Sequence, residues 1–202
     1  MPEIRHIVFD IGKVLIHYDP DIPFFRIIPD AERRAFFFAQ VCTPAWNIEQ
    51  DRGRGWAEAE ALAIADHPGF ETEIRAFRAC WAEMVSHAYD GTVDVLRALL
   101  DDGHDVTMLT NFAADTFVEA RAMYPFLNLS RGITVSGEVG LLKPDPEIYH
   151  HHARAFGLDP SATLFIDDSA ANVEGAKSAG WQAIRFVDPA GLRADLAGLG
   201  LF

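Results

Sequence analysis

The 202-residue sequence has few cysteines and no long apolar run. Two cysteines, Cys42 and Cys80, are too few for a disulfide framework, which is typical of proteins from a reducing compartment. No stretch reaches the roughly 18 uncharged apolar residues of a membrane span, and the charged residues Glu3 and Arg5 stand where a signal sequence would be apolar. We therefore expect a cytoplasmic protein with no membrane partner.

Positive charge is also scarce. The 17 Lys and Arg residues face 30 Asp and Glu residues, which gives a formal net charge of -13. Nucleic acids are polyanions that such a chain repels, so a nucleic-acid partner is not expected. An anionic small molecule would need a local cation or a bound metal.

Short apolar runs indicate strands that are buried on both faces of a parallel sheet. They lie at 4–9, 106–109, 133–135, 163–166 and 183–187. Amphipathic segments of helical length alternate with the later runs, at 93–100, 115–123, 147–156 and 172–179, and a short terminal helix is expected within 189–202. This alternation predicts an α/β fold with a doubly wound parallel sheet.

The interval between the first two predicted strands is longer than one crossover helix requires, and its pattern is helical. Helices are expected near 31–41, 56–67 and 70–87, with loops at 19–29, 43–55 and 66–69. We therefore predict two domains: a core of residues 1–15 and 88–202, and a small all-helical cap of residues 16–87.

Polar residues follow the predicted strands. They are Asp10 after the first, Thr110-Asn111 after the second, Lys143 in the loop after the third and Asp167-Asp168 after the fourth. Ligands of open parallel sheets bind beyond the carboxyl ends of the strands, so these side chains are expected at one site.

Three of these strand-end residues, Asp10, Asp167 and Asp168, are carboxylates that would repel one another unless a cation neutralises them. Oxygen ligands without histidine or thiolate favour Mg²⁺. A single strand-end Asp often only caps the helix that follows it, but the full set in this order favours a shared metal site.

Four segments resemble the ordered motifs of the haloacid dehalogenase superfamily. They are Phe9-Asp10-Ile11-Gly12-Lys13-Val14-Leu15, Leu109-Thr110-Asn111, the stretch from Gly140 through Lys143 to Tyr149, and the stretch from Phe165 through Asp167-Asp168 to Asn172. The helical insertion lies where that family has its cap. Residues 46–53 look like a cap segment of the family's bacterial sugar-phosphate phosphatase branch.

The resemblance implies a role for each strand-end residue. Asp10 would be the nucleophile and form an aspartyl-phosphate. Mg²⁺ would be held by Asp10, the carbonyl of Gly12, Asp167 and Asp168, with Asp168 the better match to the direct ligand. Phosphoryl oxygens would be bound by Thr110, Asn111 and Lys143, and the catalytic set would be Asp10, Lys143 and Thr110.

The chain departs from the phosphatases of this superfamily at Gly12, where they usually carry an Asp that protonates the leaving oxygen. The neighbouring Lys13 is a weak candidate to replace it, because adjacent side chains of an extended segment point to opposite faces. Without an acid, good leaving groups such as those of sugar 1-phosphates or acyl phosphates should be favoured.

Other polar residues have less certain assignments. In the cap, Glu49 and Arg52 are candidates to contact the substrate. Tyr18 or Asp19 follows the nucleophile's loop and is a candidate for the site entrance. Asn172, one helical turn beyond Asp168, either orients a metal-bound water or lies on the surface.

Two clusters are interpreted as structural. Consecutive residues on a helix point about 100° apart, so His150, His151 and His152 cannot share one metal ion and are expected on a solvated face. The three aromatic residues Phe36, Phe37 and Phe38 are expected in the core of the cap or at its interface with the sheet domain.

The resulting hypothesis is an enzyme, a Mg²⁺-dependent phosphatase acting on a small phosphorylated metabolite such as a sugar phosphate. Two alternatives stay open. A 2-haloacid dehalogenase also uses an Asp nucleophile but needs neither metal nor acid, although the family's dehalogenases have Ser and Asn where this chain has Asp167 and Asp168. A non-catalytic phosphate-binding protein of the same fold is the other.

Overall fold

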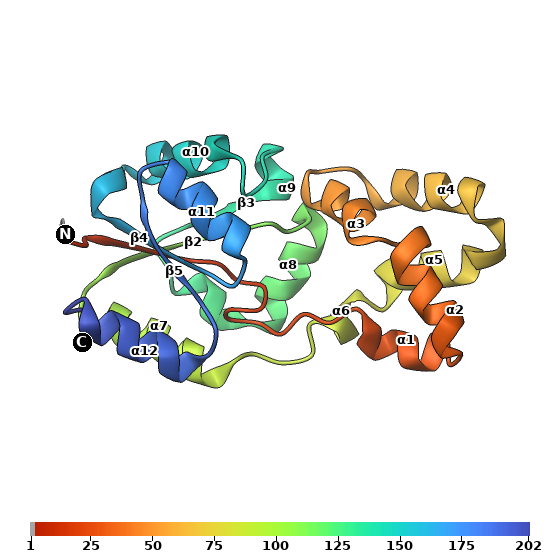
Figure 1. Cartoon of the computed structure of the whole chain (residues 1–202), viewed down its shortest axis with the longest axis horizontal. Coiled ribbons are helices and arrows are strands. Elements are labelled where there is room, and N and C mark those ends of the chain that lie inside the picture. Colours follow the sequence, from red (N-terminus) through yellow and green to blue (C-terminus); the bar gives the residue numbers. More distant parts are fainter. Residues whose placement is uncertain (1–2) are drawn as a thin grey trace.

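A five-stranded parallel sheet forms the centre of one half of the molecule (Figure 1). The computed structural model describes residues 3–202, so the first two residues of the predicted core lie outside the described part. The strands are β1 (His6–Phe9), β2 (Asp105–Thr110), β3 (Ile133–Val135), β4 (Thr163–Asp167) and β5 (Gln182–Arg185), in the order β3-β2-β1-β4-β5. Every neighbouring pair is parallel, which confirms the predicted sheet.

Helices cover both faces of the sheet. Figure 1 shows α10 (Pro146–Phe156) and α11 (Ala170–Ser178) above it, with α7 (Asp90–Asp101) and α12 (Pro189–Gly198) below it. Successive strand residues point to opposite faces, so Ile7 and Phe9 of β1 join one hydrophobic core, which includes α7 and α12, while Val8 joins the core of α10 and α11. This arrangement is the doubly wound α/β fold that the sequence predicts.

The remaining elements of this half lie in the crossovers. They are α8 (Ala114–Met123), the short helix α9 (Ser136–Val139), and the 3₁₀ turns η3 (Pro125–Asn128) and η4 (Pro160–Ala162). The chain leaves β1 towards β2 and β3, and then returns to the other side for β4 and β5. Strand order reverses beside β1, and the carboxyl ends at such a switch point form the usual binding crevice of this fold.

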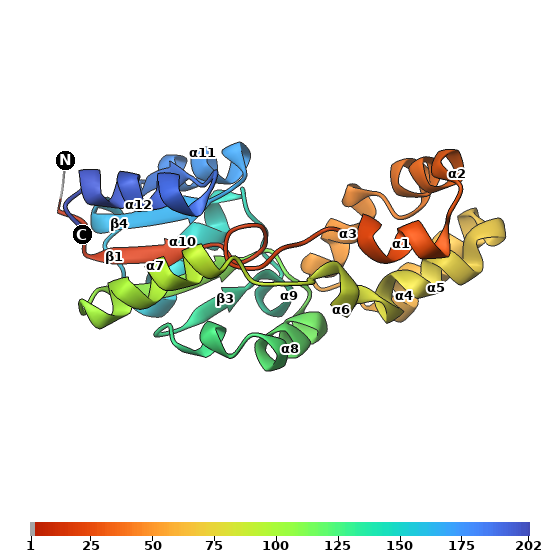
Figure 2. The ribbon, with the colours of Figure 1, turned by 90° about the horizontal axis from the view of Figure 1, so that it is seen from below.

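A second group of helices lies beyond one end of the sheet, at the opposite end of the molecule from both termini (Figures 1 and 2). It consists of α1 (Asp21–Ile27), α2 (Ala31–Phe36), the π-helical η1 (Phe37–Val41), α3 (Pro44–Asp51), α4 (Trp56–Asp66), η2 (Pro68–Phe70), α5 (Glu71–Ala79) and α6 (Trp81–Met84). Aromatic rings fill its centre: the ring of Phe24 stacks on that of Phe37 with the centres 4.9 Å apart, and it lies tilted to the ring of Phe77 with the centres 6.0 Å apart. The division at residues 16 and 87 stays a prediction.

Two segments expected to be loops contain helices, α1 within 19–29 and α3 within 43–55. The start signal of α3 is local: Pro44 occupies its first turn, and the Thr43 hydroxyl accepts a hydrogen bond from the Trp46 N–H at 3.0 Å. A reading of apolar periodicity misses such short helices. The helix expected at 70–87 is also wrong in extent, because α5 ends at Ala79 and α6 at Met84.

The two connections between the sheet and the helical group run side by side. The His17 N–H donates to the His87 carbonyl at 2.9 Å, and the Tyr89 N–H donates to the Leu15 carbonyl at 2.9 Å. The imidazole rings of His17 and His87 stack with their centres 4.6 Å apart. These contacts tie the two crossings together.

Candidate active site

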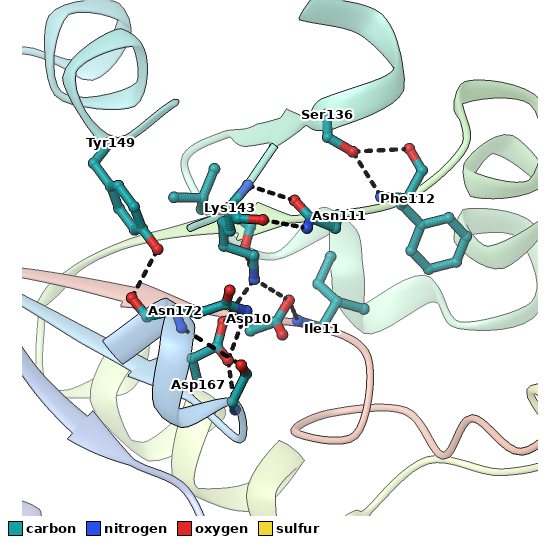
Figure 3. A network of polar contacts seen from close by, with 11 residues as sticks. Asp10, Ile11, Asn111, Phe112, Ser136, Lys143, Tyr149, Asp167 and Asn172 are labelled. Atoms are coloured by element: carbon teal, nitrogen blue, oxygen red, sulfur yellow. Dashed lines mark hydrogen bonds and ion pairs between the residues drawn. The ribbon is translucent and has the colours of Figure 1, made fainter. Parts of the chain in front are cut away.

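Three charged side chains from different elements meet at the carboxyl edge of the sheet (Figure 3). Asp10 follows β1, Asp167 ends β4, and Lys143 comes from the loop before α10. The Lys143 ammonium lies 2.8 Å from Asp10 Oδ1 and 2.7 Å from Asp167 Oδ2, and it also donates to the Leu109 carbonyl at 3.1 Å. All three charged side chains are buried, so the cluster is held by mutual neutralisation.

The protonation of these groups follows from their burial and their contacts. Burial alone lowers the pKa of Lys143, but the charges and hydrogen bonds of Asp10 and Asp167 outweigh it and raise that pKa above its usual value. Burial raises the pKa of Asp10 to about 7, against the lowering effect of the Lys143 charge. The lysine therefore stays a cation, and a further positive charge at the site would favour ionised Asp10.

The adjacent carboxylates Asp167 and Asp168 differ in their partners. Asp167 accepts hydrogen bonds from the Ser169 N–H at 2.8 Å and from Asn172 Nδ2 at 3.0 and 3.1 Å, in addition to its ion pair with Lys143. Asp168 is half-buried, and burial and the Asp167 charge raise its pKa. Within the described residues, no other residue donates a hydrogen bond to its carboxylate. Asp168 is therefore the freer of the two to bind a cation.

These carboxylates fit a hard divalent cation. One oxygen from each of Asp10, Asp167 and Asp168 lies within 4.8 Å of the other two. The cluster contains no histidine or cysteine, and oxygen-only sites of this kind suit Mg²⁺. Asn172, for which the sequence left two interpretations, orients Asp167 and lies neither on open surface nor in the cluster itself.

Thr110 ends β2 beside this cluster, and Asn111 follows it. The Thr110 hydroxyl is buried and makes no hydrogen bond to any described residue. A buried hydroxyl without a partner is costly, so its position favours an external acceptor such as a phosphoryl oxygen. The Asn111 amide instead binds the main chain of Lys143, donating from Nδ2 to its carbonyl at 3.0 Å and accepting from its N–H at 2.9 Å.

Gly12 lies on the wall of the site, and the space around it is open. A Cβ atom placed there would meet nothing within 4 Å. The next residue, Lys13, adopts a left-handed conformation with φ of 60° and its side chain is exposed. Burial and the Asp167 charge raise the pKa of Asp168, and the Lys13 charge has a smaller, lowering effect on it. Because residue 12 is a glycine, this position supplies no proton donor for the leaving group.

A cavity of about 550 Å³, its open mouth included, lies between the sheet and the helical group. Its lining comes from both halves of the molecule: Gly12, Ile16, His17, Tyr18, Asn47, Asp51, Trp56, Trp81, Val85, Asn111, Phe112, Ala113 and Thr116. Tyr18 lines this cavity, whereas Asp19 accepts a hydrogen bond from the Asp21 N–H at 2.9 Å at the start of α1. A role of either residue at the site entrance stays a prediction. Two of its lining residues are close in sequence to the strand-end residues: Gly12 lies two residues after Asp10, and Asn111 directly follows Thr110.

The helix α3 presents different residues to this cavity from those expected. Glu49 and Arg52 lie 3.6 Å from each other in an exposed pair and are not among the lining residues. Asn47 and Asp51 line the cavity instead. The spacing of four residues that puts them on one face of the helix was readable in the sequence, but which face meets the sheet was not.

Asp51 joins the two halves of the molecule. Its carboxylate accepts a hydrogen bond from the Ala113 N–H, and burial raises its pKa to about 7 against this bond and the Lys143 charge. Its carbonyl accepts a hydrogen bond from the Ser136 hydroxyl at 2.6 Å. Sequence reasoning missed this residue.

The histidine interpretation is wrong for His152. This ring is fully buried, with Nε2 2.9 Å from the Thr107 hydroxyl and Nδ1 2.8 Å from the Thr134 hydroxyl. Burial lowers its pKa to about 3, so it is a neutral core residue.

Of the three phenylalanines, Phe37 is buried in the helical group, while Phe36 is 47% exposed.

The geometry of the site agrees with the comparison of the chain with protein families. A family model for haloacid dehalogenase-like hydrolases matches residues 4–180. The chain belongs to this family. The match contains Asp10, Lys143 and the Asp167-Asp168 pair in their order along the chain.

Several relatives in sequence are phosphatases. The chain is 26% identical over 208 residues to a D-ribitol-5-phosphate phosphatase of Bacteroides thetaiotaomicron, covering 96% of this chain and 97% of that one. It is 34% identical over 94 residues to the sesquiterpene phosphatase astK of Aspergillus oryzae, and this match spans 46% of this chain and only 48% of that protein. Among solved structures, the HAD family enzyme bt-2542 of Bacteroides thetaiotaomicron has the same fold, with a TM-score of 0.72, 24% identity, and 92% and 95% of the two chains covered.

Proposed function

We propose that the chain is a Mg²⁺-dependent phosphatase that transfers the phosphoryl group of a small phosphorylated metabolite to Asp10. One observation carries this proposal: a buried lysine neutralises Asp10, which is one of three carboxylates that fit a divalent cation, and the neighbouring Thr110 has a buried hydroxyl without a partner. Phosphoryl transfer requires mainly positioning and charge stabilisation, which these groups supply.

The two oxygens of Asp10 are not equivalent. Lys143 Nζ and the Ile11 N–H both contact Oδ1, at 2.8 and 2.7 Å. No described residue forms a hydrogen bond or ion pair with Oδ2, so this oxygen is available for the substrate. In the proposed reaction Asp10 attacks phosphorus, the bond from phosphorus to the leaving oxygen breaks, and water then cleaves the aspartyl-phosphate.

Other residues of the chain bind and orient the phosphoryl group. The Thr110 hydroxyl donates to a phosphoryl oxygen, and the Lys143 ammonium stabilises the negative charge of the transferring group. Asn111 acts by fixing the main chain of Lys143. A Mg²⁺ ion held by Asp10, Asp168 and the Gly12 carbonyl, with Asp167 oriented beside them, would supply further charge neutralisation.

The relatives' names support phosphate monoesters as the substrate class. The full-length relative is a D-ribitol-5-phosphate phosphatase, and the relative matched over half its length is a sesquiterpene phosphatase. A reducing compartment such as the cytoplasm suits the two free cysteines. No helix in residues 3–202 is long and apolar enough to cross a membrane.

The dehalogenase alternative fits the site less well. A halocarboxylate is an anion, and the unpaired Asp168 beside Asp10 would repel it unless a cation were bound. A dehalogenase needs no cation, so the carboxylate pair would have no use in that reaction. A non-catalytic phosphate-binding protein stays the second alternative, because Gly12 lacks the usual acid.

The test is release of inorganic phosphate from a panel of phosphorylated metabolites, with Mg²⁺ and with chelator, alongside chloride release from 2-chloropropionate. We expect phosphate release that depends on Mg²⁺, and a steep rise in the Mg²⁺ requirement for Asp168→Ala. Chloride release without metal would favour the dehalogenase. Mg²⁺-dependent phosphate binding without turnover of any ester would favour the non-catalytic protein.

A further inference from the structure

The cavity beside the phosphoryl site has a mainly apolar wall. Its larger side chains are Ile16, Tyr18, Trp56, Trp81, Val85 and Phe112. Gly12, two residues after Asp10, and Asn111, directly after Thr110, both line this cavity, so the part of a substrate that leaves with the ester oxygen is expected to occupy it. The chemistry of the wall therefore selects the leaving group.

Most polar groups on the wall already have partners within the protein. The Asn111 amide binds the main chain of Lys143, the Thr116 hydroxyl donates to the Ala113 carbonyl at 3.2 Å, and the Asp51 carboxylate accepts from the Ala113 N–H. Each of these three groups therefore has at least one protein partner before any ligand enters.

Few groups are left for a ligand. The His17 ring uses Nδ1 on the Tyr89 hydroxyl at 3.0 Å, which leaves its other nitrogen. No hydrogen bond is recorded for the Asn47 side chain or the Tyr18 hydroxyl within residues 3–202. These groups offer few hydrogen bonds for the several hydroxyl groups of a sugar or polyol, and each hydroxyl left unsatisfied weakens binding.

The charge of the wall excludes a second anionic group. Among the described residues that line the cavity none is Lys or Arg, and Asp51 is the one carboxylate. His17 is the single basic side chain, and it stacks on His87. A substrate with a carboxylate or a second phosphate at its far end would therefore bury an unpaired negative charge near Asp51.

We propose that the natural substrate is the phosphate monoester of a largely hydrocarbon or aromatic alcohol, with few polar atoms and no second charge. Burial of its apolar surface against the tryptophan and phenylalanine rings provides the binding free energy. This inference rests on the proposed phosphatase function and narrows its substrate class away from sugar and polyol phosphates.

The test compares phenyl phosphates that differ only in the para substituent: propyl, dihydroxypropyl and carboxyethyl. The changes are remote from the ester oxygen, so leaving-group acidity is nearly constant across the series. With Mg²⁺ we expect kcat/KM to fall at least tenfold, which corresponds to about 1.4 kcal/mol, from the propyl to the dihydroxypropyl ester, and further for the carboxylate.

A matched pair of variants locates the preference. Val85→Thr adds one hydroxyl to the wall at nearly constant volume and should reduce the propyl to dihydroxypropyl ratio. Val118→Thr makes the same change on α8 at a side chain that is 67% exposed and outside the cavity lining, and it should keep the wild-type ratio. Thermal unfolding of both variants checks that they fold.

The outcomes separate this inference from the function beneath it. Equal or faster hydrolysis of the dihydroxypropyl ester by the wild type would overturn the apolar substrate class and leave the phosphatase proposal standing. If Mg²⁺ gives no hydrolysis of any of the three esters, the phosphatase function itself fails, and the inference fails with it.

Discussion

The Asn111 side chain is joined to the main chain of Lys143 by two hydrogen bonds, from Nδ2 to the carbonyl at 3.0 Å and from the N–H to Oδ1 at 2.9 Å. This clamp connects the end of β2 to the loop that carries the buried lysine. The ammonium in turn lies 2.8 Å from Asp10 and 2.7 Å from Asp167. The position of the Lys143 ammonium thus depends on the uncharged amide of Asn111.

Asn111→Ala should therefore lower kcat/KM through Lys143. We expect a loss of about 10²-fold, because a misplaced charge-stabilising group costs about as much as a lost donor. Asn128→Ala is the control, since within residues 3–202 the Asn128 side chain binds Arg121 and the Pro125 carbonyl at the surface and nothing at the site. Wild-type kcat/KM in Asn111→Ala would show that the loop holds Lys143 without the clamp.

Thr110→Val should change stability and activity in opposite directions. Removal of a buried hydroxyl that has no partner should raise the free energy of unfolding by about 1 kcal/mol, while loss of the phosphoryl donor should lower kcat/KM about 10²-fold. Thr107→Val on the same strand is the control: it removes the partner of His152 and should destabilise the fold by about 1–3 kcal/mol. Chemical denaturation and steady-state kinetics measure both effects. A destabilised Thr110→Val would mean that its hydroxyl is satisfied in the free protein.

Asp51 should make the folded state less stable as the pH rises. Its folded pKa of about 7 lies above the ordinary 3.8, so the folded state holds an extra proton between these values, and unfolding releases it. The contribution of this extra proton to the free energy of unfolding is complete below the ordinary pKa and is lost as the pH rises through about 7. Asp51→Asn keeps an acceptor for the Ala113 N–H and cannot titrate.

The difference in unfolding free energy between Asp51→Asn and wild type should therefore grow in the variant's favour by roughly 2 kcal/mol from about pH 5 to about pH 8. Asp115→Asn is the control, because Asp115 is exposed and pairs with Arg78 on the surface. Parallel pH dependence of wild type and Asp51→Asn would show that the Asp51 carboxyl ionises normally in the fold.

Gly12→Asp should restore the missing proton donor. The open space around Gly12 admits a side chain without a clash. In the wild type we expect kcat/KM to fall steeply as the leaving group becomes less acidic, and the variant should flatten this trend by accelerating poor leaving groups up to about 10²-fold. Gly12→Asn, which has nearly the same shape but no proton to donate, is the control. A wild type with no dependence on leaving group, under conditions where chemistry limits the rate, would mean that water or another residue supplies the proton.

The sheet and the strand-end residues were predictable because each depends on a local pattern. Continuous apolar runs mark the strands, and parallel strands bring Asp10, Asp167 and Lys143 to one edge wherever the helices lie. The pairing of helix faces was not predictable. His152 looked solvated because its two threonine partners come from β2 and β3, and Asp51 escaped notice because its partner, Ala113, lies beyond the second strand. To assign either residue, one must know which face of its helix packs against the sheet domain, and the sequence of the helix alone does not determine this.

The most direct measurement of the central claim is trapping of phosphate on Asp10. A phosphate monoester with a radiolabelled phosphorus is mixed with enzyme and Mg²⁺, quenched in acid, and the labelled peptide is identified. We predict label on the peptide that contains Asp10, with the hydroxylamine sensitivity of an acyl phosphate, and none in Asp10→Asn or with chelator. Hydrolysis by Asp10→Asn at the wild-type rate, or label on another residue, would contradict the account.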